Sequence, residues 1–363
     1  MKQLYIKLLI LLDVILIVVI IFLGLKINSI KNTNSFKFFA KSLCDEKVSP
    51  NLTPLKLPMI YIDGNKIKRY DTKCEVIFKG LTSESLRGTK PDFDLAKKHI
   101  EITKRWGANI INFYYNPVPF FDEKNLLELD KIIEYSNKNK LYVSLQPVVS
   151  YKDNWSFHEN SENTLKAKVF LSKVEKLVPI LAKRYKKYSN ILYGIWTEPH
   201  PSGIHDEYIE TAKRTIRNIQ HINPMAISMI DTSLENWNSY NHEGPIDIPN
   251  IIYHKSYYYG KDKNSIGIPK VEGPELIRSS NKDTKAPYML IEMGAYYDKD
   301  FNSPEDIETT VKILEVVRKN NISYIGYILD YSHVLALVDQ QGNPTKKGEI
   351  FKEDLERYPP TLF

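Results

Sequence analysis

Cysteine is scarce in this chain of 363 residues, which contains only Cys44 and Cys74. Two cysteines can form one disulfide in an oxidising compartment, and their number neither requires nor excludes it. No cysteine or histidine residues have the spacing of a metal site. The sequence therefore predicts no bound metal and no cofactor.

A concentrated positive charge is also missing. Lys and Arg number 50 against 44 Asp and Glu, and the lysines are spread along the whole chain. This distribution favours solubility and offers no patch for a phosphate backbone, so we expect no nucleic-acid partner. No glycine-rich phosphate loop follows the first predicted strand, which argues against a nucleotide-binding open sheet.

One long apolar run is present, LLILLDVILIVVIIFLGL at residues 8–25. At a rise of about 1.5 Å per residue it spans about 27 Å, close to the hydrocarbon thickness of a bilayer. No small-residue cleavage site follows it, so we predict an uncleaved signal anchor over residues 1–27, with a cleaved secretion signal as the alternative. Two lysines precede the run and four follow it closely, so the positive-inside rule does not favour an outside catalytic domain. We expect an extracytoplasmic catalytic domain, because a lone N-terminal span usually exports and tethers one domain.

Residues 28–57 are polar and interrupted by proline, which predicts a linker. Asp63-Gly64 then separates two alternating runs and predicts a β-hairpin. Beyond it, short apolar runs alternate with helical patterns, which predicts a parallel sheet of class α/β. Eight such units favour a closed (β/α)8 TIM barrel within one domain over residues 58–363. The predicted strands are residues 74–80, 109–115, 141–148, 191–197, 225–231, 250–258, 288–294 and 322–329.

Two of these strands end in glutamate, the fourth at Glu198 and the seventh at Glu292. The carboxyl ends of barrel strands meet at one mouth, where barrel enzymes carry their chemistry, so the two side chains are expected to converge. A protonated carboxyl group facing an ionised one is the equipment of a glycosidase. Each glutamate could instead form a buried ion pair, an explanation that suits one of them better than both.

Several motifs in chain order resemble the clan A glycoside hydrolases, and among them most of all glycoside hydrolase family 5, the cellulase and β-mannanase family. The resemblance covers about residues 58–357. It implies retaining hydrolysis of O-glycosidic bonds in β-linked glucans or mannans, with Glu198 as acid/base and Glu292 as nucleophile. Retention requires the two carboxyl groups to lie about 5–5.5 Å apart. The motifs are VIFKGL, KRWGANIINF, GIWTEP, MLIEMG and LVDQQGNPTKKG.

Positions that assist catalysis in that family are occupied differently here, although most of the replacements can still form hydrogen bonds. Only a tyrosine is kept, at Tyr258 or Tyr257. Loss of the arginine removes a charge that would keep Glu292 ionised, which leaves open a second interpretation, a carbohydrate-binding barrel with impaired catalysis. The replacements are Asn112 for an arginine, Thr197 for an asparagine, Gln146 and Ser256 for two histidines, and Ile328 or Leu329 for a tryptophan.

Aromatic residues follow most of the predicted strands, and their flat faces suit stacking on sugar rings. A polysaccharide or oligosaccharide is therefore the expected partner. A barrel enzyme acting through a metal or on a phosphorylated substrate is the third and weakest interpretation, because neither ligand clusters nor a phosphate loop occur. The predicted substrate-binding residues are Asn112, Tyr114, Gln146, Thr197, Trp237, Ser256, Tyr258 and Tyr296.

Overall fold

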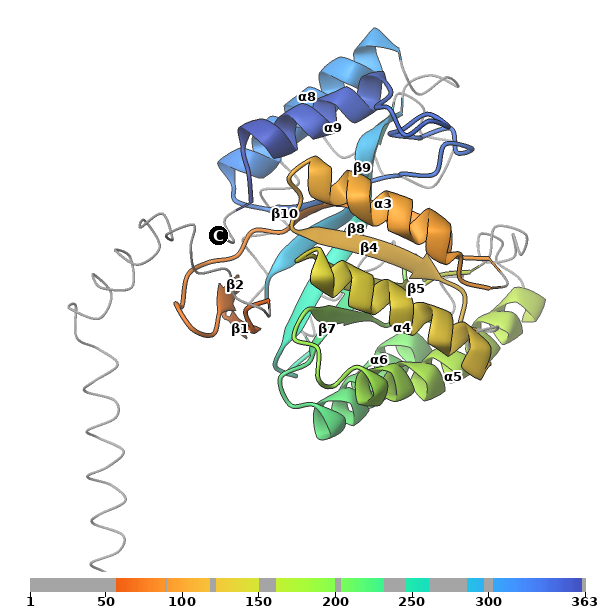
Figure 1. Cartoon of the computed structure of the whole chain (residues 1–363). Helices are drawn as coiled ribbons and strands as arrows, with labels where there is room; N and C mark the ends of the chain where they lie inside the picture. The colour runs from red at the N-terminus through yellow and green to blue at the C-terminus, as the bar shows by residue number, and fades with distance from the viewer. Residues whose placement is uncertain are drawn as a thin grey trace, which may run out of the picture. The chain divides into compact units, whose positions relative to one another are not determined.

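A computed structural model describes residues 57–88, 90–117, 122–149, 161–199, 204–231, 246–260, 286–296 and 303–360. Eight parallel strands close into a barrel in the order β10-β3-β4-β5-β6-β7-β8-β9 (Figure 1), so the predicted (β/α)8 barrel is confirmed. The strands are β3 Lys79–Leu86, β4 Ile110–Tyr115, β5 Tyr142–Pro147, β6 Ile191–Gly194, β7 Ile227–Asp231, β8 Ile251–Gly260, β9 Tyr288–Tyr296 and β10 Ser323–Gly326.

The helices bury their apolar faces against the outer side chains of the strands. Several begin at a side chain that accepts a hydrogen bond from the first helical turn, as at Asp92, Ser303 and Thr345. Such caps satisfy backbone N–H groups that have no partner within the helix. The helices are α3 Phe93–Arg105, α4 Glu123–Lys138, α5 Ser161–Arg184, α6 His205–Ile222, α8 Pro304–Lys319 and α9 Lys346–Arg357.

The first barrel strand lies later in the chain than the predicted range 74–80. Its polar stretch Thr82–Ser85 does not look like a buried strand, yet these residues are buried or nearly so. Their side chains satisfy one another: Ser83 Oγ lies 2.9 Å from Ser85 Oγ and 2.8 Å from His99 Nδ1. Buried polar groups are tolerated when they are hydrogen-bonded, which is why the hydrophobic pattern misplaces this strand.

His99 is a buried histidine of α3, and burial lowers its pKa from 6.5 to about 4. Between these values the unfolded chain binds a proton that the folded chain does not, so stability rises with pH across this range and falls as pH drops toward about 4. We expect His99→Gln to reduce the slope of unfolding free energy against pH by up to about 1.4 kcal/mol per pH unit.

Urea unfolding at several pH values between 4 and 7 measures that slope. Ser83→Ala is the matched control, because it removes the hydrogen-bond partner but leaves the imidazole buried. It is expected to lower stability while keeping the wild-type slope. An unchanged slope in His99→Gln would show that this histidine does not titrate differently in the two states.

The predicted hairpin is confirmed as β1 Ile60–Asp63 and β2 Lys66–Arg69, an antiparallel pair that turns through Gly64. Leu57, Ile60 and Ile67 pack into an apolar cluster inside the barrel. Several other members of that cluster come from the first residues of the barrel strands, so the hairpin closes the N-terminal end of the barrel. The strand residues there include Ile110, Tyr142, Leu192, Ile227, Ile252, Met289 and Ile325.

A buried charged group lies at the same end of the barrel. The carboxylate of Asp354 on α9 accepts hydrogen bonds from Lys79 Nζ at 3.2 Å and from Tyr324 Oη at 2.6 Å, and it also pairs with Arg318. Lys79 opens β3, Tyr324 belongs to β10 and Arg318 to α8. This one carboxylate therefore ties the first and last barrel strands to the two C-terminal helices.

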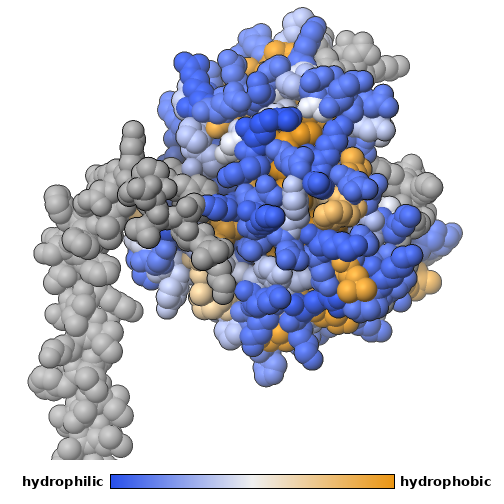
Figure 2. Space-filling model, in the orientation of Figure 1, coloured by the Kyte–Doolittle hydropathy of each residue, from blue (hydrophilic) through white to orange (hydrophobic). Residues whose placement is uncertain are grey.

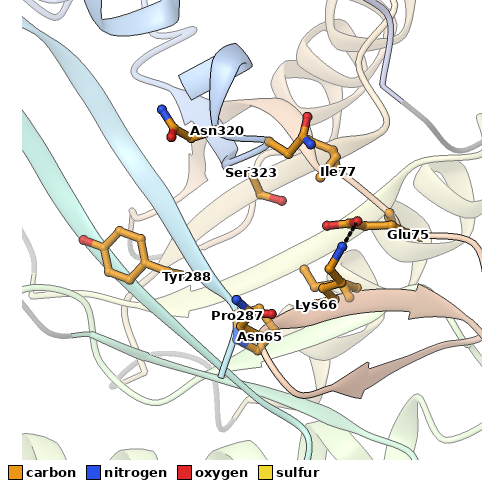
Figure 3. Close-up of a pocket in the computed structure, with 11 residues that line it drawn as sticks. Asn65, Lys66, Glu75, Ile77, Pro287, Tyr288, Asn320 and Ser323 are labelled. Atoms are coloured by element: carbon orange, nitrogen blue, oxygen red, sulfur yellow. Dashed lines mark hydrogen bonds and ion pairs between the residues drawn. The ribbon is translucent and has the colours of Figure 1, made fainter. Parts of the chain in front are cut away.

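A pocket of about 150 Å³ also opens at this end, between the hairpin, the start of β9 and the turn before β10 (Figure 3). Its lining is largely polar and includes Asn65, Asn320 and the ion pair of Lys66 with Glu75, whose N–O distance is 2.6 Å. The pocket lies at the N-terminal ends of the strands, whereas both predicted catalytic glutamates lie toward the C-terminal ends. It is therefore separate from the predicted site.

The predicted signal anchor and nearly all of the predicted linker lie outside the described residues. Within the described ranges, no helix is both long and apolar enough to cross a membrane. Cys74 is disulfide-bonded, and Cys44, the only other cysteine in the sequence, lies outside the described part. The face of the molecule seen in Figure 2 is mostly hydrophilic, with separate hydrophobic groups.

Candidate active site

Glu292 lies on β9 and is only 7% exposed. The hydroxyl of Tyr114, on β4, donates a hydrogen bond to its Oε1 over 2.5 Å. Burial raises the pKa of Tyr114 well above its usual value of 10, and the negative charge of Glu292 adds to this effect. The phenol therefore stays protonated and holds the carboxylate of Glu292 in place across the barrel.

Glu198 comes four residues after the end of β6 and is partly exposed. Its charge also raises the pKa of Tyr114, after the contributions of burial, Glu292 and Tyr327. Glu292 lies in the middle of β9 and contacts Tyr114 directly, whereas Glu198 follows the C-terminal end of β6 and acts on the same phenol through its charge.

Thr197 and Gln146 contact each other beneath Glu198. Thr197 Oγ1 donates to Gln146 Oε1 over 3.3 Å, and Gln146 Nε2 donates to Ser144 Oγ over 2.9 Å. The amide of Gln146 lies so close to Gly194 that a Cβ there would be 1.9 Å from Oε1. Glycine at position 194 therefore allows the Gln146 side chain to pass close to β6 and reach Thr197.

Asn112 and Ser256 also face polar surroundings without filling all their hydrogen bonds. Asn112 is fully buried and donates a long hydrogen bond of 3.4 Å to Thr82 Oγ1. Among the described residues, Asn112 Oδ1 and Ser256 Oγ are buried oxygens without a hydrogen-bond partner. Ser256 pairs in register with Glu292. Buried polar atoms of this kind are usually satisfied by water or a ligand, and these two are available for either.

Three more residues were predicted to bind substrate, namely Trp237, Tyr258 and Tyr296. Trp237 lies outside the described residues, and Tyr258 and Tyr296 are placed on β8 and β9 by their backbones alone. The resemblance implied that the residue at position 112, an arginine in the family, supports the nucleophile. In this structure Tyr114, two residues later on the same strand, contacts Glu292 instead.

Tyr327 is a residue of this mouth that the sequence did not indicate. Its ring lies 6.1 Å from that of Tyr114, and its hydroxyl donates to Glu84 Oε1 over 3.0 Å. The resemblance implied an aromatic position near Ile328 or Leu329, but both of these side chains are fully buried. The aromatic side chain at the mouth comes one residue earlier, which a resemblance carried by short motifs cannot resolve.

Asp231 is a second residue that the sequence did not single out. It ends β7, is fully buried, and its Oδ2 accepts a hydrogen bond of 2.8 Å from the backbone N–H of Glu198. His254 Nδ1 lies 3.7 Å from the same oxygen, and burial lowers the pKa of His254 to about 3, so its ring is neutral. An acidic residue closing a core strand is the signal that identified both glutamates, and it applies to Asp231 as well.

Nothing in the described part of the chain resembles a metal centre, since no three His, Cys, Asp or Glu side chains there are arranged to hold an ion. The chemistry available at the mouth is instead that of two carboxyl groups, a buried phenol and several amide and hydroxyl groups. Such a set can donate a proton, attack an electrophilic carbon and bind sugar hydroxyls.

Comparison with known proteins agrees with this geometry. Residues 71–333 match the model of the family described as Cellulase (glycosyl hydrolase family 5). No curated protein matches the chain. Among solved structures, a β-glucanase from Saccharophagus degradans is similar, with a TM-score of 0.65 and 16% identity over 83% of this chain and 94% of that one.

Two endoglucanases show the same fold. The catalytic domain of one from Thermobifida fusca has a TM-score of 0.56 and 14% identity, covering 81% of this chain and 96% of that one. The enzyme from Thermotoga maritima has a TM-score of 0.58 and 16% identity, covering 79% and 97%. At these identities the structural likeness establishes the fold alone.

Proposed function

The chain belongs to glycosyl hydrolase family 5, and from this premise we propose that it is a retaining enzyme that cleaves β-linked glucans or mannans. Its glycoside hydrolase activity follows from the family. The roles we assign are proton donor and base for Glu198 and nucleophile for Glu292. The observation that carries this assignment is the hydrogen bond that the Tyr114 hydroxyl donates to Glu292, and the charge of Glu198 helps to raise the pKa of the same phenol.

Retaining hydrolysis proceeds in two displacements. Protonated Glu198 gives its proton to the glycosidic oxygen while Glu292 attacks the anomeric carbon, so the bond to the leaving alcohol breaks and a glycosyl ester forms. Glu198, now ionised, takes a proton from water, whose oxygen attacks the same carbon and releases Glu292. Tyr114 keeps the Glu292 oxygen oriented throughout.

A glucan substrate is supported by one of the similar structures. The S. degradans β-glucanase was solved in complex with cellotetraose, and that structure has a TM-score of 0.63 to this chain at 16% identity, over 86% of this chain and 99% of that one. We further propose an extracytoplasmic barrel tethered through residues 1–27, which rests on the apolar run at residues 8–25.

The alternative of a binding protein with impaired catalysis rests on the missing arginine. Tyr114 weakens that reasoning, because it supplies a buried donor to Glu292 where a cation was expected. Turnover of β-glucan and β-mannan oligosaccharides by the wild-type protein separates the two functions.

The stereochemical course tests the mechanism. Proton NMR of the first product is expected to show the β-anomer before mutarotation. Glu198→Ala is expected to recover activity on an activated aryl glycoside when azide is added, with a β-glycosyl azide as product, because azide needs no general base. An α-anomer as the first product would contradict retention, and failure of azide to restore turnover would contradict the role of Glu198.

A further inference from the structure

The backbone of Glu198 adopts an uncommon conformation. Its φ angle is +54°, in the left-handed region, although it is not a glycine and is followed by Pro199. A side chain at Cβ disfavours this region, and a following proline restricts the residue before it further. Such conformations persist at functional sites when surrounding contacts fix them. The position of the Glu198 side chain therefore depends on what holds its backbone.

Two neighbouring strands supply contacts that hold this turn. On one side, Thr197 N donates to the carbonyl of Pro147, at the end of β5, over 2.9 Å. On the other, Glu198 N donates to Asp231 Oδ2, at the end of β7, over 2.8 Å. Of these two contacts, the hydrogen bond to Asp231 is the one made by Glu198 itself. Because its acceptor is a side chain, a substitution at position 231 can remove it.

Asp231 is itself rigidly placed. Tyr208, a fully buried residue of α6, accepts a hydrogen bond from the Asp231 backbone N–H over 3.0 Å and donates one to its carbonyl over 3.3 Å. The Asp231 charge also acts on Lys255, where it opposes the lowering of the lysine pKa by burial. A fully buried carboxylate is costly unless it is compensated, so its placement beneath Glu198 indicates a specific task.

We propose that Asp231 is a positioning residue for the acid/base: by accepting the Glu198 N–H it fixes the left-handed backbone of Glu198 and directs the carboxyl group at the glycosidic oxygen. This inference rests on the proposed role of Glu198. Its consequence is selective. Substrates whose leaving group needs a proton depend on Asp231, and substrates whose leaving group departs unaided do not.

The test compares Asp231→Leu with Asp231→Asn. Leucine has a similar volume and no acceptor, whereas asparagine keeps a carbonyl oxygen for the Glu198 N–H. The substrates are aryl β-glycosides of the disaccharide that the wild type cleaves, one with a phenyl and one with a 2,4-dinitrophenyl leaving group. For Asp231→Leu we expect kcat/KM to fall about 100-fold on the phenyl glycoside and less than about fivefold on the dinitrophenyl one. Asp231→Asn is expected to restore most of the phenyl activity.

Glu198→Ala, assayed in parallel, distinguishes the two ways of failing. Equal losses on both substrates in Glu198→Ala would overturn the acid/base assignment. If Glu198→Ala loses more kcat/KM on the phenyl glycoside than on the dinitrophenyl one but Asp231→Leu does not, the positioning role is overturned. The positioning role is also overturned if Asp231→Asn loses as much kcat/KM on the phenyl glycoside as Asp231→Leu. Should the leucine variant lack a cooperative unfolding transition, Asp231→Ser, whose hydroxyl is too short to reach Glu198 N, replaces it with the same expectation.

Discussion

Glu292→Gln is expected to lower kcat on β-linked oligosaccharides by about 10⁴-fold or more, the scale on which loss of an essential nucleophile acts. An amide cannot form the glycosyl ester. Its carbonyl oxygen can still accept the hydrogen bond of Tyr114, so the contact over 2.5 Å in the wild type has a replacement and the fold should persist. Steady-state hydrolysis of an oligosaccharide, with the unfolding midpoint measured alongside, checks both parts.

Glu84→Gln is the matched control, because Glu84 is another carboxylate on a barrel strand near the mouth. Its Oε1 pairs with Arg87 Nη1 over 2.5 Å and accepts the Tyr327 hydroxyl, so a structural role accounts for it. We expect Glu84→Gln to remain within about tenfold of wild type, as for the loss of one charge-assisted hydrogen bond. If Glu292→Gln retained comparable activity, the nucleophile would have to be sought elsewhere.

Asp354→Ala is expected to lower the free energy of unfolding by about 3–5 kcal/mol, more than any other substitution proposed here. Removing one partner of a buried ion pair leaves the other charge uncompensated. Two cations and a phenol depend on this carboxylate, and Lys79 is itself buried. Burial already lowers the pKa of Lys79, an effect that Asp354 opposes. The free energy of unfolding in denaturant measures the loss.

Glu353→Ala provides the comparison on the same helix, since its side chain points to solvent one residue earlier. Surface substitutions of this kind usually change stability by no more than about 0.5 kcal/mol. A loss in Asp354→Ala no larger than in Glu353→Ala would mean that the buried charges at this end of the barrel do not depend on each other.

The barrel could be predicted from the sequence because alternation of apolar runs and helices is a property of the whole chain. The first strand was misplaced because Ser83, Ser85 and His99 satisfy one another through contacts that hydrophobicity does not record. The two glutamates could be recognised because the hydrophobic pattern does record them: each is an acidic residue at the end of a predicted apolar run.

Finer features of the site depend on register across the barrel. Tyr114 on β4 reaches Glu292 on β9 although β3 and β10 lie between the two strands in the barrel and 178 positions separate the two residues in the chain. Asn112, two residues earlier on the same strand, points toward Thr82 instead. Which of two residues on one strand contacts a partner on another is decided by register, and a single sequence gives no measure of it.

The hairpin that packs beneath the barrel bears on how a polymer can be cut. Ile60 and Ile67 close the N-terminal end of the barrel, and apolar side chains from the strands fill its interior. The barrel thus offers no passage through which a glycan could thread. A long substrate must instead bind across the C-terminal end of the barrel, and both products must leave from that same end.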